Sequence, residues 1–292
     1  MKMIFFTLFL CAAAGGIAAQ TTLQVATRNI RKTVVWKPGY ELFINGEKAE
    51  VQVSPVDTGA VIVTAELSAK HPSLDTATTD LETWQFLVST AGKKIYIRAY
   101  IGLASGKKAP LSNMKVKITV LAPKSCPVSL SNKFGKVRLE QLDGPMALTG
   151  EFCSFQLVSL SGDLEINSQY GNIEGNNLGG KIDVQSKRAD IHLDGITADC
   201  TIRSEYGQIV LGASGKLGNV NVTGNKSDIT VEMQSVSSHN FSLHSAYGSV
   251  TAPPGFDTSG SSVDNPRAAL QNSSGSPDIK VETTFGKIII KQ

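Results

Sequence analysis

Two aspartates have the type and the spacing for acid–base chemistry on a sugar. Asp190 and Asp228 occupy the same position of a short internal repeat, two copies apart. If the copies stack as strands of a sheet, the two carboxylates lie roughly 9.6 Å from each other. Inverting glycosidases hold their acid and base ~6.5–9.5 Å apart. One hypothesis is therefore a polysaccharide-acting hydrolase or lyase with Asp190 as acid and Asp228 as base.

The alternative for these aspartates is structural, because Asp after a turn commonly hydrogen bonds the turn backbone. The segments 187–190 and 225–228 look like one repeat variant used twice, which favours this alternative. The sequence has no nucleophile elbow, phosphate-binding glycine loop or zinc pattern. We therefore predict a protein that is not an enzyme, with no cofactor and no metal. The histidines, which show no metal-ligand spacing, are His71, His192, His239 and His244.

A second candidate site is a column of the repeat that holds rings and cations. Simple strand alternation would bury this column, but its Arg and Lys members argue against burial, since unpaired charges are costly inside a protein. We expect a corner to reset the alternation and place the column at the surface. Stacked rings and cations would then contribute ~0.5–1 kcal/mol per contact. The column is either a stabilising edge ladder or a platform for a glycan or peptide, with these candidate ligand-binding residues: Tyr170, Arg188, Tyr206, Lys226 and Tyr247.

The repeat that positions these residues reads apolar-x-apolar-x-small-x-aromatic-Gly-x-apolar-x-apolar. Its first five starts are 18 residues apart, and the later gaps are 20, 21 and 38. A short fixed period is typical of a solenoid, and the alternation is typical of half-buried strands. Eighteen residues are too few for a strand, a helix and two loops, so we predict an all-β fold, a parallel β-helix. The copies start at Val128, Met146, Leu164, Ile182, Cys200, Val220, Phe241 and Ile279.

Two further columns describe the corner. The glycine after the aromatic position permits a turn with positive φ. The small column before it predicts an inside corner with little room. Its members are Asn132, Gly150, Ser168, Ser186, Ser204, Gly224, Ser245 and Thr283.

The chain divides into three predicted parts. Residues 1–19 have the charged start, short apolar run and small-residue end of a secretory signal peptide, which predicts export to the periplasm or the outer cell surface. Residues 20–127 are a less regular, β-rich capping region with a degenerate first coil at 42–53. Residues 128–292 are the repeats, with a loop insertion at 251–278 before the last coil. No segment after the leader is apolar for 18 residues, so we predict no transmembrane segment in the mature chain.

The net charge bears on nucleic-acid binding, and the positions of the cysteines bear on disulfide pairing. The net charge is +3 with both signs interspersed, which is not the clustered basic face of a nucleic-acid-binding protein. Cys153 and Cys200 are about 14 Å apart at sheet spacing, too far for a disulfide. Whether Cys126 pairs with Cys153 stays open, and Cys200 is expected to be a buried, inert thiol.

Several short motifs now resemble a known family. They are the strand end 121–124, Asn132-x-Phe134-Gly135-x-Val137, Tyr170-Gly171-x-Ile173 and Tyr206-Gly207-x-Ile209. They resemble the bacterial putative-adhesin family of exported β-strand-repeat proteins, a domain of unknown function, over about 120–292 and loosely over 40–70. The resemblance implies a β-helical envelope protein that acts as a binding or structural scaffold for an unknown protein or glycan partner. An envelope-signalling accessory protein is a further alternative, and the resemblance supplies no site residues.

Overall fold

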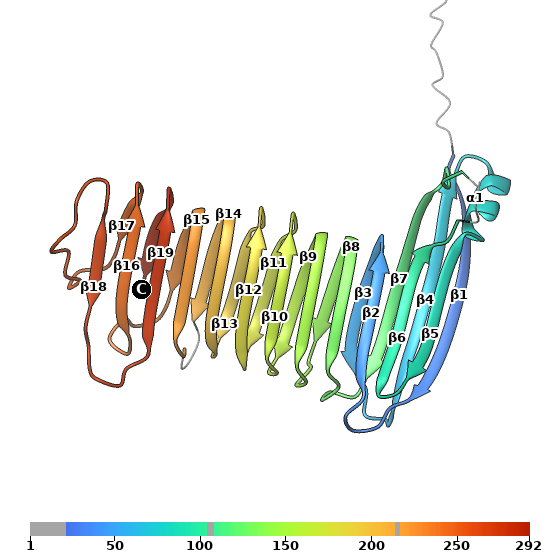
Figure 1. Ribbon diagram of the computed structural model, residues 1–292, viewed down its shortest axis with the longest axis horizontal. Coiled ribbons are helices and arrows are strands. Elements are labelled where there is room, and N and C mark those ends of the chain that lie inside the picture. Colours follow the sequence, from blue (N-terminus) through green and yellow to red (C-terminus); the bar gives the residue numbers. More distant parts are fainter. Residues whose placement is uncertain (1–21, 104–107, 214–216) are drawn as a thin grey trace, which may run out of the picture.

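The computed structural model describes residues 22–103, 108–213 and 217–292, so the predicted signal peptide at 1–19 lies outside the described residues. The described chain is an all-β, solenoid-like stack of short coils (Figure 1). Its helix α1 (Leu74–Leu81) begins where the Ser73 side chain accepts a hydrogen bond from the Thr76 backbone N–H. No helix in the described part of the chain has the length and apolarity that a membrane crossing needs.

Each coil contributes one strand to each of two facing walls. In one coil, β10 (Leu164–Gln169) belongs to the first wall and β11 (Ile173–Leu178) to the second. The next coil repeats this with β12 (Lys181–Lys187) and β13 (Ile191–Ile196). Both steps are parallel and advance 18 residues, with Leu164 opposite Ile182. The predicted coil length and register are therefore confirmed.

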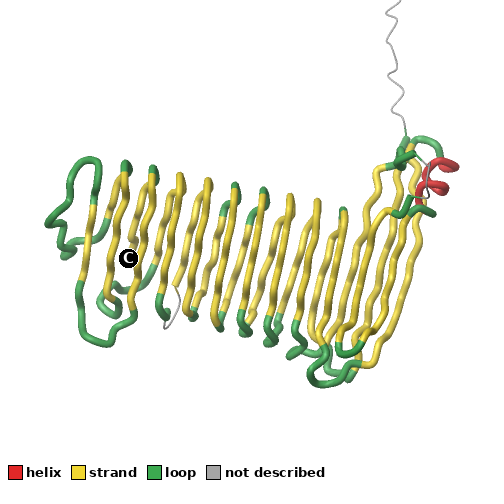
Figure 2. The backbone as a smooth tube through the Cα atoms, in the orientation of Figure 1, coloured by secondary structure: helices red, strands yellow, loops and turns green. Residues whose placement is uncertain are grey.

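The walls extend over the whole row of coils (Figure 2). Because β8, β9, β14 and β15 run through the corner unbroken, both walls belong to one continuous sheet. The first wall contains, in spatial order, β5 (Trp84–Ala91), β6 (Lys94–Ile101), β2 (Glu41–Glu47), the first halves of β8 (Val128–Glu140) and β9 (Met146–Leu160), β10, β12, the first halves of β14 (Asp199–Ala213) and β15 (Val220–Glu232), β19 (Asp278–Thr284), β16 (Asn240–Ala246) and β18 (Arg267–Leu270). The second contains β1 (Gln24–Val35), β4 (Ala60–His71), β7 (Asn113–Ala122), β3 (Ala49–Pro55), the second halves of β8 and β9, β11, β13, the second halves of β14 and β15, β20 (Lys287–Lys291) and β17 (Ser249–Thr251).

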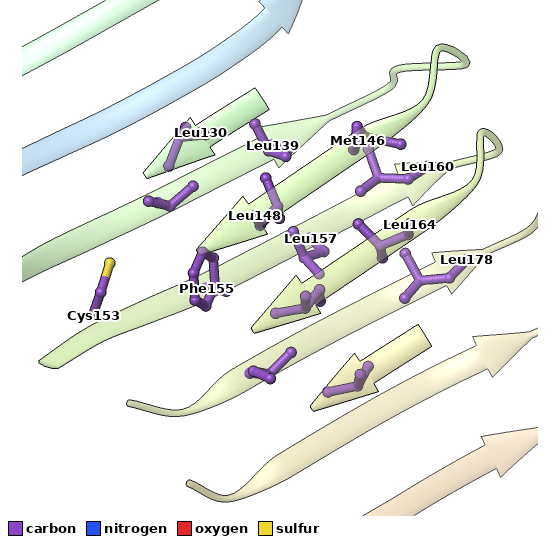
Figure 3. Packing of buried hydrophobic residues seen from close by; sticks show 14 of the residues in the cluster. Leu130, Leu139, Met146, Leu148, Cys153, Phe155, Leu157, Leu160, Leu164 and Leu178 are labelled. Carbon is purple, nitrogen blue, oxygen red and sulfur yellow. The ribbon is translucent and has the colours of Figure 1, made fainter. Parts of the chain in front are cut away.

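The core is the narrow space between the walls. Alternate residues of each strand enter it, so that Leu148, Leu157 and Leu164 lie side by side between the strands (Figure 3). These leucines are at most 3% exposed. Identical columns become apolar ladders along the axis, which is how a coil too small to bury its own side chains becomes stable in a stack.

The N-terminal region continues the stack and then bends away from it (Figure 1). The segment 42–53, expected to be a degenerate first coil, lies next to the first repeat, since β2 pairs with β8 in parallel with Leu42 opposite Val128. Strands β5 and β6 form an antiparallel hairpin that turns at 91–94. The chain then departs from solenoid geometry, since β4 and β1 add to the second wall in antiparallel order.

The C-terminal coils contradict the predicted order. The last coil of the chain, β19–β20, lies between β15 and the coil β16–β17. Ile279 therefore stands between Val220 and Phe241. The segment 251–278 is not only a loop, since it includes β18, which pairs antiparallel with β16. The repeat pattern specifies each coil's shape, but backbone hydrogen bonds accept any coil of the same shape as a neighbour.

Candidate functional site

The corner between the two walls has the same backbone conformation in nine coils. Its turning residue is never glycine, and its φ lies between +49° and +58°, the left-handed region. The sequence pattern assigned this φ to the following glycine, which is wrong, because the aromatic or cationic residue itself makes the turn. The nine residues, in spatial order, form what we call the corner ladder: Lys48, Phe134, Phe152, Tyr170, Arg188, Tyr206, Lys226, Phe285 and Tyr247.

The left-handed turn points the ladder side chains outward, as the sequence predicts. Phe152 stacks on Tyr170 with ring centroids 4.7 Å apart. The Arg188 guanidinium lies 5.6 Å from the ring centroids of both Tyr170 and Tyr206. Lys226 Nζ lies 5.2 Å from the Tyr206 centroid. Within this stretch each inner ring presents its edge to solvent, because its faces are covered by ladder neighbours.

Tyr247 does not join the other four predicted residues. The inserted coil places Phe285 between Lys226 and Tyr247, and Tyr247 stacks on Phe285 at 5.3 Å. Tyr170, Arg188, Tyr206 and Lys226 are contiguous, whereas Tyr247 is the outermost ring at the C-terminal end. Phe134 and Phe152 belong to the same column of the repeat but were not among the candidates, although their column position was a usable signal.

The small column before the ladder lies inside the corner, as predicted. Ser168 is fully buried, and its hydroxyl donates to the Gly171 carbonyl at 2.9 Å. Ser245 and Thr283 instead donate to corner carbonyls of the neighbouring coil, those of Gly286 and Ser227. These hydroxyls donate to backbone carbonyls at the corner, where the turn interrupts the regular hydrogen bonding between strands.

The two aspartates serve as links between coils. Asp190 Oδ1 accepts a hydrogen bond from the Gln208 backbone N–H at 2.9 Å. Asp228 Oδ1 accepts one from the Lys287 N–H, also at 2.9 Å. In both cases the N–H donor belongs to the next coil and not to the aspartate's own turn. Each hydrogen bond therefore links two coils, which is a structural role for the aspartate. This engagement favours the structural interpretation over an acid–base pair.

A groove opens where the N-terminal end of the ladder meets the bent strands. Its volume is about 790 Å³, within the ~300–1,000 Å³ typical of ligand sites. Phe134 lies in its wall and is 53% exposed. One face of the Phe134 ring stacks on Phe152 at 5.2 Å, and the opposite face is directed toward the Lys48 corner. We call this cavity the corner groove.

Lysines outnumber carboxylates in the corner groove. Glu50 lies opposite Lys117 on one side and Lys136 on the other, and Glu66 also lies opposite Lys117. Lys115 has Ser68 as its strand partner. Within the described residues, no ion pair closer than 4.0 Å involves any of the six charged residues of this groove, which are Lys48, Lys115, Lys117, Lys136, Glu50 and Glu66.

The three cysteines of the described chain are free and buried, so the open Cys126–Cys153 pair does not form. Burial raises the pKa of Cys126 to about 11 and that of Cys200 to about 12. Burial also raises the pKa of Cys153, against the opposing effect of the hydrogen bond from Asn132. The expected buried thiol at Cys200 is confirmed.

A raised pKa leaves less reactive thiolate at a given pH. We therefore expect a chain starting at Gln20 to show no fast-reacting thiol toward Ellman's reagent at about pH 8, and all three thiols to react once denatured. A Thr149→Cys variant, with its thiol on the exposed outer face, should react at once and serves as the control. Rapid labelling of the native unsubstituted chain would contradict this assignment.

A comparison with known protein families shows which family this chain belongs to. The family model described as Toastrack DUF4097 matches residues 40–291. The chain belongs to the Toastrack DUF4097 family. The resemblance found in the sequence motifs is thereby confirmed, and the match includes the ladder corners from Lys48 to Phe285.

Several solved structures are similar to this Toastrack chain at low sequence identity. A putative adhesin from Bacteroides fragilis is 14% identical over 90% of this chain and 97% of that one, with a TM-score of 0.47. A putative adhesin from Parabacteroides merdae is 9% identical, covering 91% and 97%, with a TM-score of 0.43. A putative lipid binding protein from Parabacteroides distasonis is 12% identical, covering 92% and 97%, with a TM-score of 0.39. No curated protein sequence matches this chain. Similarity at this level does not assign a function.

Proposed function

We propose that this Toastrack protein is an exported, non-enzymatic scaffold of the cell envelope that binds a ligand in the corner groove. The proposal of export rests on the leader-like pattern at 1–19. The observation that carries the binding role is the Phe134 ring, which lines the groove, stacks on Phe152 with one face and has its other face on the side of the Lys48 corner, which also lines the groove. A rigid, pre-formed aromatic surface costs little ordering entropy when a ligand binds.

The ladder candidates take a supporting part in this proposal. Tyr170, Arg188, Tyr206 and Lys226 hold one another in place and keep the corner rigid. Phe152 and Tyr170 also line the groove, next to Phe134. Stacking in the ladder thus fixes the position of the Phe134 ring, while the groove supplies the surface that contacts the ligand.

The test is binding of a glycan panel, displayed on an array, by a chain starting at Gln20. We expect Phe134→Asn to abolish capture of any glycan that the unsubstituted chain retains. Asn removes the ring and tolerates the left-handed backbone, so the corner should persist. Tyr247→Asn is the matched control, because Tyr247 ends the same ladder but does not line the groove.

Equal loss of capture in both variants, or in neither, would contradict the groove as the binding site. The same panel tests the enzyme alternative, since incubation with the protein should leave every glycan intact. Turnover that disappears in Asp190→Asn would instead show that the linking carboxylates are catalytic.

A further inference from the structure

We propose that the ligand of the corner groove is an anionic saccharide, a sugar chain that carries carboxylate, sulfate or phosphate groups. This inference rests on the proposed binding role and adds the chemical class of the ligand. It follows from three observations: the free aromatic face, the kind and number of charges beside it, and the contrast with a second groove on the same molecule.

The aromatic part fits the C–H face of a sugar ring. An aromatic ring carries negative charge density on its faces and positive density at its edge. The polarised C–H groups of a pyranose are attracted to such a face. Among the described rings of the groove, Phe152 stacks on Phe134 and on Tyr170, and Tyr170 has Phe152 on one side and the Arg188 guanidinium on the other. Phe134 has a stacked ring on one side, and its other side is that of the Lys48 corner.

The charged part fits repeated anionic groups. Lys117 and Lys136 have glutamate strand partners, whereas Lys115 lies opposite Ser68 and Lys48 lies at the corner. The groove lining therefore has a surplus of positive charge, with four lysines and two glutamates among the described residues. Among the described residues that line the groove, the cations are all lysines and none is an arginine. Lysine acts as a point charge on a flexible stem, which suits anions spaced along a chain better than planar bidentate recognition.

The positive groove is a local feature and not a consequence of net charge. The outer face of the first wall holds another groove, of about 570 Å³, which is mainly acidic. Glu41, Asp163, Glu165 and Asp183 line it, with Lys181 as its cation. An anionic ligand is repelled there and attracted to the corner, so the two surfaces of one molecule should discriminate by charge.

The probes are size-defined anionic oligosaccharides of three kinds: oligogalacturonides, sulfated chondroitin fragments and a phosphorylated mannan fragment. Neutral maltooligosaccharides of equal length and poly-glutamate are the comparisons. We expect calorimetry on the chain starting at Gln20 to show binding of at least one anionic saccharide. Its affinity should fall when salt is raised from about 50 to about 300 mM, because exposed charge contacts are screened.

The decisive variant is Lys115→Gln combined with Lys117→Gln. We expect it to weaken binding of the anionic saccharide by about tenfold, as two exposed charge contacts allow. Lys181→Gln, in the acidic groove, is the matched control and should leave binding unchanged. Lys115, Lys117 and Lys181 are all exposed, so both variants should unfold at the temperature of the unsubstituted chain.

The possible results distinguish a failure of the anionic-saccharide inference from a failure of the proposed binding role of the corner groove. Equal binding of neutral and anionic saccharides, lost in Phe134→Asn, would overturn the anionic class and leave the groove function intact. Binding of poly-glutamate as tight as that of the saccharides, independent of Phe134, would overturn the saccharide. Binding of no anionic saccharide also overturns the inference.

Discussion

Replacing Gly171 by alanine is expected to destabilise the protein by about 3 kcal/mol, the upper range of overpacking effects. Gly171 follows the corner residue Tyr170, and a methyl group there would lie 2.0 Å from the Cys153 carbonyl oxygen of the neighbouring coil. The same methyl would lie 2.6 Å from the Cys153 carbonyl carbon. These atoms belong to the backbone, so the clash can be relieved only by separating the two coils.

The need for glycine recurs along the stack. A methyl on Gly135 would lie 1.9 Å from the Ala49 carbonyl oxygen, and one on Gly207 would lie 2.2 Å from that of Ala189. In the coils between them the same position holds small buried residues, including Cys153 and Ala189. From Gly135 to Gly207, glycine thus alternates with a small side chain, and each glycine makes room for the close approach of its neighbour.

The measurement is the urea midpoint of Gly171→Ala against that of Gly59→Ala. A methyl on Gly59 would have no heavy atom within 4 Å, and its φ lies outside the left-handed region. We expect Gly59→Ala to change the midpoint little or to raise it slightly. Equal midpoints for the two variants would show that the coils can move apart at no cost and that the corner is not tightly packed.

Removing residues 278–292 is expected to release two coils and not one. If the coils were stacked in chain order, this truncation would take away only the end of the row. In the structure β19 pairs with β15 on one side and with β16 on the other. Its removal leaves β16 tied only to the short antiparallel strand β18, and leaves the edge of β15 open.

Hydrogen exchange read by mass spectrometry can distinguish the two arrangements. In the truncated chain we expect the amides of 240–251 to lose protection completely, together with partial loss along β15, and the protein to self-associate through its open edge. Ala268→Asp is the control, because Ala268 is a buried residue of the outermost strand β18. That variant should expose only β18 and the outer edge of β16. Retained protection at 240–251 after truncation would contradict the inserted position of β19.

Much of this molecule could be predicted from sequence because the coil is a local unit. The columns beginning at Leu164 and Ile173 repeat every 18 residues, and the pairing of Leu164 with Ile182 follows from that period alone. The outward direction of the ladder was also predictable, since Arg188 and Lys226 occupy a column that could not be buried. A repeat carries its own side-chain pattern in each copy, so both periodicity and burial are visible in one sequence.

Features that depend on contacts between segments distant in the chain could not be predicted from the sequence. The position of Phe285 between Lys226 and Tyr247 depends on which coil stacks against which, and the motif is the same in every coil. The corner groove combines Phe134 with Lys115, from a strand that does not carry the repeat. The reason for glycine at 171 is the Cys153 carbonyl oxygen of another coil.

The sequence by itself determined the coil: its length, its strands, its buried columns and its outward ring-and-cation column. Only the tertiary structure decided the order of the coils, the residue that adopts the left-handed turn, and the surface where a ring face and lysines come together. The physical reason is that side-chain alternation is set by neighbours in the chain, whereas stacking uses backbone hydrogen bonds that carry no residue identity.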